Sequence, residues 1–370
     1  MMRVAIVHDW LNTRVGGSEK VLMELANLYP DADIYTLIFR PEFYRGQIDP
    51  KRVTTSHLQR WPRLLTDKPS YLLPLLPTAI EQFDLSSYDV VISSSNAFSK
   101  GVLTPPRTLH ICYCYSPMRF AWDYWPRYLT ELSIGPIRRM AARGVISKVR
   151  LWDYYSSKRV DHWIAISDHI AARIKKYYGA KAEVIYPPVQ IDDFEPLASR
   201  SDHYLTLSTL TPYKKIDLAI KACNQLGRKL IVVGSGFDRK RLEGLAGPTI
   251  KFAGRVSDEE KARLLATAKA LLNPQEEDFG IASVEALASG IPVIAFARGG
   301  AAEIVSDGET GVLYEDDSVE GLVAAIKRSE ALNYDRDQLL QASRRFSASY
   351  FAKTFTTTVE KLYADHISQL

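Results

Sequence analysis

The sequence predicts a two-domain α/β protein in which each domain is built on a parallel, doubly wound sheet. Short apolar runs of strand length alternate with segments of helical periodicity along the chain, and this alternation is typical of parallel sheets covered by helices. A length of 370 residues indicates roughly two domains, and 46% hydrophobic residues suffice for two cores. The prolines at 187–188 separate two groups of runs, which we take as the boundary between the domains.

The first half contains six apolar runs, at 3–7, 34–39, 90–94, 109–113, 163–166 and 183–189. The first run continues through a polar loop with Gly16-Gly17 into a helical pattern over 18–28. This loop lacks the Gly-x-Gly-x-x-Gly spacing of dinucleotide-binding folds, so an oxidoreductase is a poor match. The glycine pair either lets the backbone approach a ligand or serves a tight turn that needs positive φ.

The second half repeats the alternation, with runs at 204–208, 229–233, 250–253, 270–272, 292–296 and 312–314. Ser257 and Glu260 form a capping box that opens the helix before the fourth of these runs. The last twenty residues have a helical pattern. We therefore predict a first domain over 1–188, a second over 189–350 and a C-terminal helix over 351–370.

The loop that follows the run at 270–272 is the clearest candidate for a binding site. Ligands of open parallel sheets bind beyond the carboxyl ends of the strands, so this loop lies where a ligand is expected. Gly280 allows a ligand to approach the backbone closely. The N–H groups of Ile281, Ala282 and Ser283 begin a helix and suit a phosphate.

Carboxylates flank this phosphate site. Glu277 precedes the helix and Glu285 lies in its first turns, so both side chains are able to face one crevice. Two acceptor groups beside a phosphate site indicate a ligand with hydroxyl groups on either side of the phosphate, such as a ribose and a sugar. The alternative is that Glu285 merely favours the helix N-terminus and that the acidic residues 276–278 are solvated loop charges.

Two lysines follow the first run of the second half. The run at 204–208 leads through Thr209 to Lys214-Lys215, which places both cations near the carboxyl end of a strand. One cation ~4 Å from a phosphate is worth about 4 kcal/mol at an effective dielectric constant of ~20. An exposed helix terminus contributes about 0.3 to 1 kcal/mol, so the lysine should dominate diphosphate binding. The alternative is a surface pair at a helix start.

Residues 108–125 combine charge with flat aromatic side chains. Tyr115 lies two residues after the run at 109–113, and Arg119, Trp122 and Asp123 follow the Ser-Pro pair after it. Such a mixture suits the faces and hydroxyl groups of a sugar. The alternative is an aromatic core cluster with a structural Arg–Asp pair. Asp31 and Asp33 lie in a turn before a strand, so we interpret them as turn residues and not as metal ligands.

The first half of the chain carries the positive charge. Residues 1–190 hold 25 basic and 17 acidic side chains, a balance of +8, and the remaining residues hold 22 and 26, a balance of −4. The helical stretch 127–159 is basic and amphipathic, and 60–77 is apolar and rich in proline. At roughly 1 kcal/mol per basic side chain near an anionic leaflet, both segments favour docking on a membrane surface. A solvated helix face packed on the sheet explains the basic stretch about as well.

The compartment follows from what the sequence lacks. No signal-peptide core and no apolar run of ~20 residues is found. The three cysteines, Cys112, Cys114 and Cys223, have neither metal nor redox spacing, which favours reduced thiols. We therefore expect a cytoplasmic protein that binds the inner face of the plasma membrane peripherally.

Several of these motifs occur in the order found in a known family. Gly16-Gly17, the segment Tyr115-Ser-Pro-Met-Arg119, Ser167, Lys214 and the block from Glu277 to Pro292 resemble the nucleotide-sugar signature of family 4 retaining glycosyltransferases. The resemblance implies the GT-B fold, with two Rossmann-like domains facing each other across a cleft and a C-terminal helix that returns to the first domain. The first domain would face the acceptor and the membrane, and the second would bind the nucleotide sugar.

The resemblance also implies roles for individual residues. Glu277 would hold donor-sugar hydroxyls and Glu285 the ribose. The backbone of Phe279, Gly280, Ile281 and Ala282 would contact sugar and phosphate, as would Gly16 and Gly17 from the first domain. Lys214 would bind the diphosphate, so Lys214 and Glu277 are the catalytic candidates.

Two positions depart from the family pattern. The family arginine on the diphosphate corresponds to Thr209 here, so the second cation would be Lys215, Arg255 or Arg298. The family histidine that approaches the donor sugar corresponds to Tyr115, which does not titrate near neutral pH. By resemblance the reaction retains anomeric configuration and needs neither metal nor cofactor.

The segments Tyr115-Ser-Pro-Met-Arg-Phe120 and 212–220 look most like those of mannosyltransferases of surface-polysaccharide assembly. We therefore predict a hexosyltransferase that uses GDP-mannose and a lipid-linked glycan acceptor. Rival interpretations are a sugar-nucleotide 2-epimerase of the same fold and a non-catalytic glycan- or lipid-binding adaptor. The basic stretch lacks a recognised nucleic-acid-binding module, so no nucleic-acid partner is expected.

Overall fold

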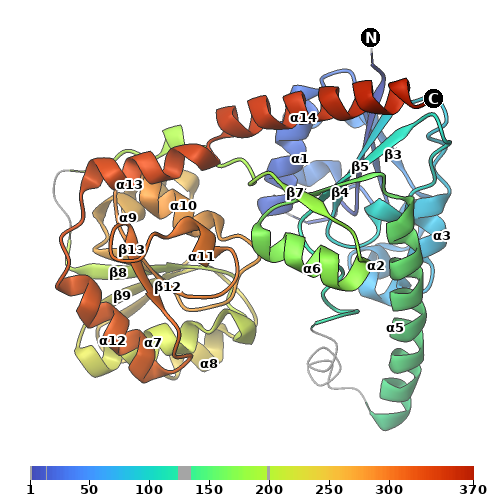
Figure 1. Cartoon of the computed structure of the whole chain (residues 1–370). Coiled ribbons are helices and arrows are strands. Elements are labelled where there is room, and N and C mark those ends of the chain that lie inside the picture. The colour runs from blue at the N-terminus through green and yellow to red at the C-terminus, as the bar shows by residue number, and fades with distance from the viewer. Residues whose placement is uncertain (1, 14, 124–134, 198–200) are drawn as a thin grey trace. The chain divides into compact units, whose positions relative to one another are not determined.

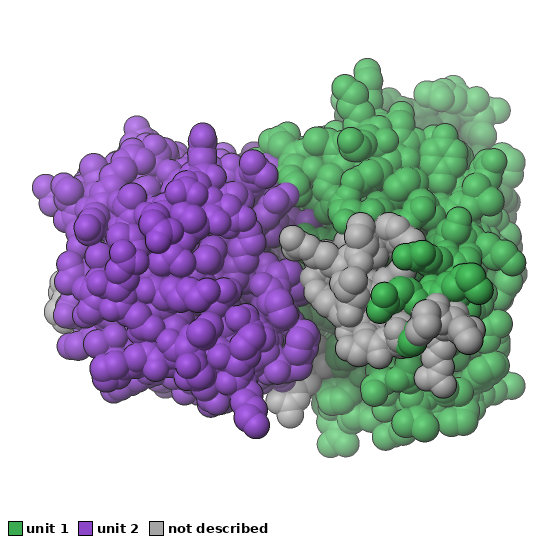
Figure 2. Space-filling model, turned by 90° about the horizontal axis from the view of Figure 1, so that it is seen from below, with its two compact units in different colours: residues 1–187, 351–370 green, residues 188–350 purple. Residues whose placement is uncertain are grey.

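The computed structural model describes residues 2–13, 15–123, 135–197 and 201–370. The chain divides into two compact units, shown in different colours in Figure 2. Unit 1 comprises residues 1–187 and 351–370, and unit 2 comprises residues 188–350. The division falls at the Pro187-Pro188 pair, one residue from the predicted boundary.

Unit 1 is built on a seven-stranded parallel sheet in the order β3-β2-β1-β4-β5-β6-β7 (Figure 1). Its strands are β1 (Val4–His8), β2 (Asp33–Thr36), β3 (Val53–Thr55), β4 (Val90–Ser95), β5 (Leu109–Cys114), β6 (His162–Ala165) and β7 (Ala182–Val184). Its α-helices are α1 (Gly17–Leu28), α2 (Arg63–Thr66), α3 (Leu76–Glu81), α5 (Pro136–Ser156), α6 (Asp168–Tyr178) and most of α14 (Ala348–Ser368). Short 3₁₀ turns include η4 (Pro69–Leu72), η5 (Ser99–Gly101) and η6 (Ser157–Arg159).

Both faces of this sheet are covered. Residues of α3 and α5, among them Ile80, Ile146 and Val149, join one buried cluster with Val7 of β1. Helix α14 packs its Phe351 and Phe355 rings against Tyr113 of β5, with ring centroids 5.8 and 5.9 Å away. The C-terminal segment is therefore an integral part of the unit 1 core.

Three details of unit 1 differ from the sequence predictions. Strand β3 was not predicted. The run at 183–189 forms only the short strand β7, because Pro187 and Pro188 have no N–H to donate to a ladder. The proline-rich segment 60–77 enters the core in part, with Leu72 and Leu76 almost fully buried. Pro77 lies in the first turn of α3, where a missing N–H costs nothing.

Unit 2 contains a six-stranded parallel sheet in the order β10-β9-β8-β11-β12-β13. Its strands are β8 (His203–Leu207), β9 (Lys229–Val233), β10 (Ile250–Gly254), β11 (Ala270–Asn273), β12 (Val293–Phe296) and β13 (Gly311–Tyr314). Its helices are α7 (Ile216–Leu226), α8 (Arg239–Glu243), α9 (Asp258–Thr267), α10 (Ile281–Ala288), α11 (Ala301–Ile304), α12 (Val319–Glu330) and α13 (Arg336–Ser343). Helices α9, α10 and α13 lie on one side of this sheet, and α7 and α12 on the other (Figure 1).

The structure confirms the predicted fold class, two Rossmann-like domains with parallel sheets. In each sheet the strand order reverses at one position. This topological switch point lies between β1 and β4 in unit 1 and between β8 and β11 in unit 2. Ligands of such sheets bind outside the carboxyl ends of the strands at the switch point, so these two places are where a site is expected.

Candidate functional site

The switch point of unit 2 brings together the two residues that the sequence identified as catalytic candidates. Lys214 lies in the loop after β8, and Glu277 lies in the loop after β11. Lys214 Nζ is 2.8 Å from Glu277 Oε1. The two side chains are 18% and 20% exposed, so the ion pair is largely shielded yet reachable from solvent.

Local sequence explains the position of Lys214. Pro212 begins the 3₁₀ turn η8 (Pro212–Lys214), where its fixed φ fits the first helical residue. Lys215 has φ 50° and is the one non-glycine residue with positive φ in the part of the chain that the structure describes. This left-handed residue ends η8 and begins α7. Non-glycine residues in this conformation cost about 1 to 3 kcal/mol, and such strain is concentrated at functional sites.

The neighbouring lysine has a different partner. Lys215 Nζ forms an ion pair with Asp317 and lies over the Phe296 ring, 5.2 Å from its centroid. The charge of Lys215 is therefore already balanced within the protein. Thr209, at the position of the family arginine, is exposed and carries no charge.

The backbone around Glu277 is held by a glycine pair that the sequence interpretation missed. Gly300 N–H donates to the Glu277 carbonyl at 2.8 Å, and Gly299 forms an isolated parallel β-bridge with Glu277. A Cβ on Gly299 would lie 2.2 Å from the Glu277 carbonyl oxygen, and a Cβ on Gly300 would lie 2.4 Å from Phe279 Cα. Only glycine permits this close approach. The Gly299-Gly300 pair is separated from the end of β12 by two residues, and this glycine pair is the sequence signal that could have identified it.

The start of α10 matches the predicted phosphate site in most respects. Gly280 has φ 111° and forms the N-cap of this eight-residue helix. Phe279 is buried and its ring packs against Phe346, with centroids 5.5 Å apart, so only its backbone is available to a ligand. The prediction for Ser283 was wrong, because its N–H donates to the Gly280 carbonyl at 2.9 Å. This leaves the N–H groups of Ile281 and Ala282 as the candidates.

Glu285 is buried on α10 and has a partner on another helix. Lys261 Nζ of α9 lies 2.8 Å from Glu285 Oε1. The sequence interpretation did not identify Lys261, and no local pattern could have done so, because the pair joins two helices that are 24 positions apart in the chain.

The remaining candidates for a second cation lie on either side of the switch point. Arg255 is exposed after β10, and its Nε donates to Ser235 Oγ at 2.7 Å in the glycine-rich loop after β9. Arg298 is also exposed, and its guanidinium group lies 5.6 Å from the Phe296 ring centroid. Arg298 directly precedes Gly299, which forms a β-bridge with Glu277. Of these two arginines, Arg298 is therefore the one whose backbone lies next to that of Glu277.

In unit 1, Gly16 adopts an extended conformation with φ −114°, and neither Gly16 nor Gly17 has positive φ. The alternative that a positive-φ turn requires the pair is therefore wrong. Gly16 N–H donates to Glu19 Oε2 at 2.8 Å, and a Cβ at Gly16 would lie 2.8 Å from that oxygen. A larger residue at position 16 would therefore require the Glu19 carboxylate to shift.

Tyr115 is buried and its hydroxyl group is occupied by the protein. Tyr115 Oη lies 2.7 Å from Ser94 Oγ and 3.1 Å from the Ser18 carbonyl. Ser94 Oγ is in turn 2.9 Å from His8 Nδ1. Burial raises the pKa of Tyr115 well above its ordinary value. The interpretation of Tyr115 as a sugar contact is corrected, because the side chain closes an internal polar network.

The aromatic segment after Tyr115 is also packed internally. Trp122 stacks on Tyr177 with centroids 4.8 Å apart, and its Nε1–H donates to Asp153 Oδ2 at 2.7 Å. This arrangement matches the alternative of an aromatic core cluster. Asp123 accepts hydrogen bonds from Arg173 and Tyr177, so Arg173 is an ionic partner of Asp123. Arg119 is half-buried, and residues 124–134 lie outside the described part of the chain.

The switch point of unit 1 is filled by the protein itself. The buried Asp9 carboxylate, just after β1, accepts the N–H groups of residues 96–99 at 2.6 to 2.9 Å. These four donors would otherwise suit an anionic ligand. These four N–H groups are therefore occupied by a side chain of the same unit.

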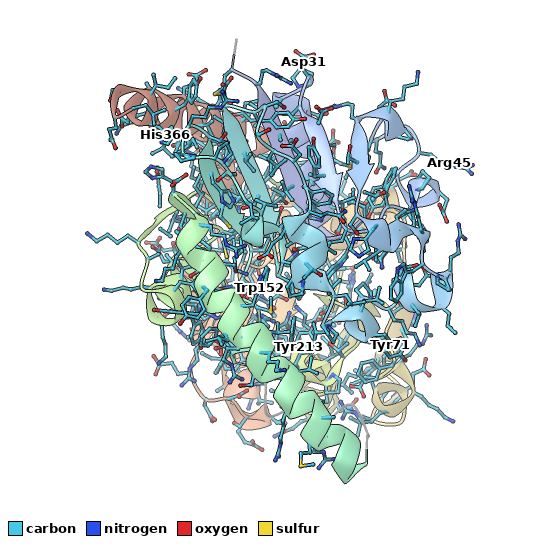
Figure 3. All side chains as sticks on the ribbon, turned by 90° about the vertical axis from the view of Figure 1, so that its right-hand side faces the viewer. Asp31, Arg45, Tyr71, Trp152, Tyr213 and His366 are labelled. Atoms are coloured by element: carbon cyan, nitrogen blue, oxygen red, sulfur yellow. The ribbon has the colours of Figure 1, made fainter. Side chains whose placement is uncertain are left out.

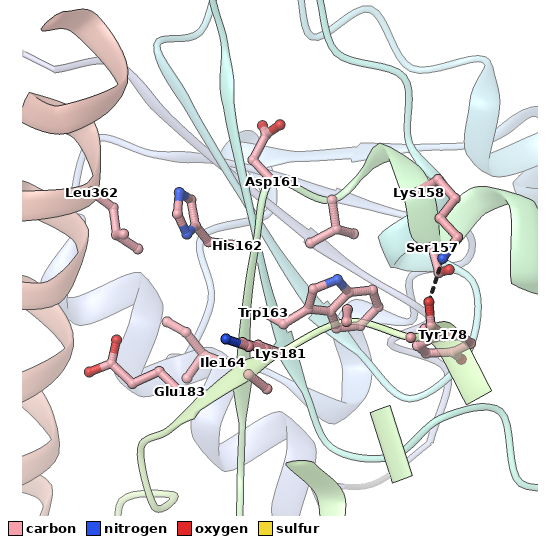
Figure 4. Close-up of a pocket in the computed structure, with 14 residues that line it drawn as sticks. Ser157, Lys158, Asp161, His162, Trp163, Ile164, Tyr178, Lys181, Glu183 and Leu362 are labelled. Carbon is pink, nitrogen blue, oxygen red and sulfur yellow. Dashed lines mark hydrogen bonds between the residues drawn. The ribbon is translucent and has the colours of Figure 1, made fainter. Parts of the chain in front are cut away.

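A separate cavity of about 550 Å³ in unit 1 has none of the predicted site residues in its lining (Figure 4). It is lined by Lys158, Asp161, His162 and Glu183 around β6 and β7, and by Leu362 of α14. Within the described residues we find no group of three or more His, Cys, Asp or Glu side chains arranged to hold a metal ion.

The fold defines a class of protein, the α/β proteins with two Rossmann-like units. Residues 190–346 match the family model of glycosyl transferases group 1, and residues 15–193 match that of glycosyltransferase family 4. The chain belongs to the family 4 glycosyltransferases.

Individual relatives are distant. The chain is 28% identical to an uncharacterized glycosyltransferase of Methanocaldococcus jannaschii over 59% of this chain and 63% of that protein. It is 33% identical to a GDP-mannose-dependent alpha-mannosyltransferase of Mycolicibacterium smegmatis over 41% of this chain and 40% of that protein. The chain is 26% identical to the human alpha-1,3/1,6-mannosyltransferase over 56% of this chain and 59% of that protein. The chain thus spans about half the length of the curated relatives it matches.

Solved structures share the fold over nearly the whole chain. Sucrose-phosphate synthase from Thermosynechococcus elongatus has a TM-score of 0.72 at 18% identity and covers 98% of this chain and 100% of its own. The Anabaena protein HepE in complex with UDP and glucose has a TM-score of 0.69 at 17% identity, with coverage of 97% and 100%.

Proposed function

We propose that this chain is a retaining mannosyltransferase that transfers mannose from GDP-mannose to a lipid-linked glycan at the cytoplasmic face of the membrane. The single observation that carries the proposal is the Lys214–Glu277 pair at the switch point of unit 2. It places a cation for a diphosphate and an acceptor for sugar hydroxyls within one hydrogen bond of each other. The proposed donor follows from the relatives of Mycolicibacterium smegmatis that are named GDP-mannose-dependent mannosyltransferases.

The donor would lie across the carboxyl ends of β8 and β11. Lys214 and the N–H groups of Ile281 and Ala282 would bind the diphosphate, and Glu285 the ribose. Glu277 would exchange its ion pair for hydroxyl groups of the mannose. Arg298, adjacent to the Gly299 bridge, is the proposed second cation in place of the family arginine.

The reaction would break the bond between the anomeric carbon and the diphosphate oxygen. The acceptor hydroxyl would attack from the face that the diphosphate leaves, and its proton would pass to the departing phosphate oxygen. The cations named above would balance the charge that develops on the diphosphate, and we propose that no metal is required. Transfer that continues in EDTA supports this point, and transfer restored only by a divalent cation contradicts it.

A thermal-shift panel of GDP-, UDP- and ADP-sugars tests the donor. We expect GDP-mannose to raise the melting temperature selectively, because a ligand that binds only the folded state stabilises it by mass action. Stabilisation by UDP-sugars alone would contradict the choice of nucleotide. The control is free mannose, which lacks the diphosphate and should leave the melting temperature unchanged.

Two outcomes of an activity assay separate the rival functions. An adaptor would neither hydrolyse nor transfer from any nucleotide sugar, so detectable turnover excludes it. A 2-epimerase would convert a free nucleotide sugar without an added acceptor. A product that appears only when a glycan acceptor is present therefore favours the transferase.

The proposed membrane contact lies on unit 1. On α5, Met140, Leu151 and Tyr155 are exposed on the same stripe as Arg143 and Lys148. Arg150 is not part of this stripe, because its Nε donates to the Ala121 carbonyl and its guanidinium group lies over Trp122. The opposite face of α5 packs into the core, for example through the half-buried Trp152, so the exposed stripe is available to a partner (Figure 3).

The segment 60–77 adds a second apolar group. Leu64 is 77% exposed and Tyr71 60% exposed, with the cations Arg60 and Lys68 nearby in the chain. Figure 3 shows Tyr71 to the right of α5 on the same view of the molecule. Among the described residues, no helix has the length and apolar character that a bilayer span needs. We therefore propose a reversible, peripheral contact with anionic lipid.

Co-sedimentation with vesicles tests this contact. We expect the protein to bind vesicles that contain phosphatidylglycerol at low ionic strength and to be released by high salt, because the basic side chains act within a Debye length. The double variant Leu64→Ser/Leu151→Ser should bind several-fold less. Phe237→Ser is the matched control, since Phe237 is equally exposed at 77% but lies in unit 2. Equal binding by all three proteins would contradict the proposed surface.

A further inference from the structure

Glu285 forms an ion pair with Lys261, a residue to which the proposed function assigns no role. Its side chain is 8% exposed, and one of its two oxygens, Oε1, lies 2.8 Å from Lys261 Nζ. A buried carboxylate without a counter-charge takes up a proton or turns toward solvent. Lys261 therefore fixes where the Glu285 carboxylate points.

Lys261 is itself held from three sides. Its Nζ lies 3.2 Å from Asp258 Oδ1 one turn earlier in α9, in addition to its contact with Glu285. The ammonium group lies 5.4 Å from the centroid of the Phe194 ring, which is buried beside the short turn η7 (Ile191–Asp193). Burial acts to lower the pKa of Lys261, but the charges of Glu285 and Asp258 raise it above its ordinary value. A side chain fixed in this way is suited to orient another.

The two oxygens of the Glu285 carboxylate have different surroundings. Oε1 accepts the charged hydrogen bond from Lys261, and no protein donor to Oε2 is found among the described residues. A ribose carries two adjacent hydroxyl donors, and an ionised carboxylate oxygen has the lone pairs to accept them. Because both α9 and α10 begin at the carboxyl edge of the sheet, the pair lies at the edge where a nucleotide would bind.

We infer that Lys261 is a positioning residue for nucleotide recognition: it holds the Glu285 carboxylate so that Oε2 faces the ribose diol of the donor. This inference rests on the proposed function, in which Glu285 faces the ribose. It adds that discrimination between a ribose and a sugar lacking the 2′- and 3′-hydroxyls depends on a lysine that does not touch the nucleotide.

The test compares the affinities of GDP and 2′,3′-dideoxy-GDP, measured by calorimetry on the full chain. Losing a charged hydrogen-bond partner costs about tenfold to hundredfold in affinity, so the wild type should prefer GDP by at least ~10-fold. In Lys261→Met we expect this preference to fall to about threefold or less. Lys261→Arg, which keeps the charge, should restore most of it.

The control is Lys269→Met. Lys269 makes an ion pair of the same length, 2.8 Å, with Glu330, but it lies at the amino end of β11, away from Glu285. This variant should keep the preference of the wild type. The double variant Lys261→Met/Glu285→Gln should discriminate no less than Glu285→Gln alone, because an amide needs no counter-charge. This last comparison also serves if Lys261→Met proves poorly folded.

The outcomes separate this inference from the proposed function. If the wild type binds neither GDP nor UDP, the proposed function fails. If the wild type prefers the ribose nucleotide and Lys261→Met keeps the full preference, Lys261 has no positioning role and only the inference fails. The same comparison applies with UDP and 2′,3′-dideoxy-UDP if the protein selects uracil, since the inference concerns the ribose and not the base.

Discussion

Replacing Lys214 with alanine should lower sugar transfer at least tenfold to hundredfold. A cation ~4 Å from a phosphate is worth about 4 kcal/mol at an effective dielectric constant of ~20, and part of this energy is spent in breaking the ion pair with Glu277. The variant also leaves Glu277 without its partner beside an anionic ligand. Both effects act against the donor, so kcat/KM should fall together with the affinity for GDP.

Steady-state transfer kinetics and calorimetry with GDP provide the measurement. The matched control is Lys221→Ala, which removes an exposed lysine of α7 whose ion pair with Asp217 lies on the helix surface. Such surface pairs contribute about 0 to 1 kcal/mol, so this variant should keep wild-type kinetics. If Lys214→Ala transfers sugar at the wild-type rate, Lys214 does not bind the diphosphate.

Replacing Glu277 with glutamine should separate transfer from nucleotide binding. Transfer should fall at least tenfold to hundredfold, because a charged hydrogen-bond partner of the donor sugar is lost, at a cost of about 1.5 to 3 kcal/mol. The affinity for GDP without the sugar should stay equal or rise, because Lys214 no longer shares its charge with Glu277. The two effects have opposite signs, and a merely structural role for Glu277 would not produce them.

The same two assays, transfer and GDP calorimetry, test this variant. Glu276→Gln is the control, since it changes the adjacent and more exposed acidic residue of the same loop. A Glu277→Gln protein that transfers at the wild-type rate, or that loses GDP affinity in parallel with transfer, would show that Glu277 does not hold the donor sugar.

The fold was predictable because a buried parallel strand leaves a clear pattern. Every predicted apolar run of unit 2 became a strand, from β8 to β13, since strands covered on both faces read as continuous apolar segments. Strand β3 was not predicted because its three residues, 53–55, include two threonines and are only partly buried. The burial of Leu72 and Leu76 was not predicted for the proline-rich segment 60–77, but a proline in the first helical turn, such as Pro77, is compatible with a core helix.

Site residues were predictable where they lie in a loop after a strand. They were not predictable where they act through a partner residue on another helix or strand. Glu277, Gly280 and Lys214 follow strands directly, so topology alone brings them to the switch point. Lys261 and Asp9 act through partners on other elements, and no local pattern marks them. Tyr115 was misread for the same reason, because the sequence does not reveal that Ser94 and Ser18 already occupy its hydroxyl.

A crystal structure of the protein with GDP tests the central claim most directly. The account predicts the diphosphate at the carboxyl ends of β8 and β11, within about 3 Å of Lys214 Nζ and of the first N–H groups of α10, with the ribose on Glu285. Glu277 should have released Lys214. A nucleotide bound without contact to Lys214, or at a place other than the switch point of unit 2, would contradict it.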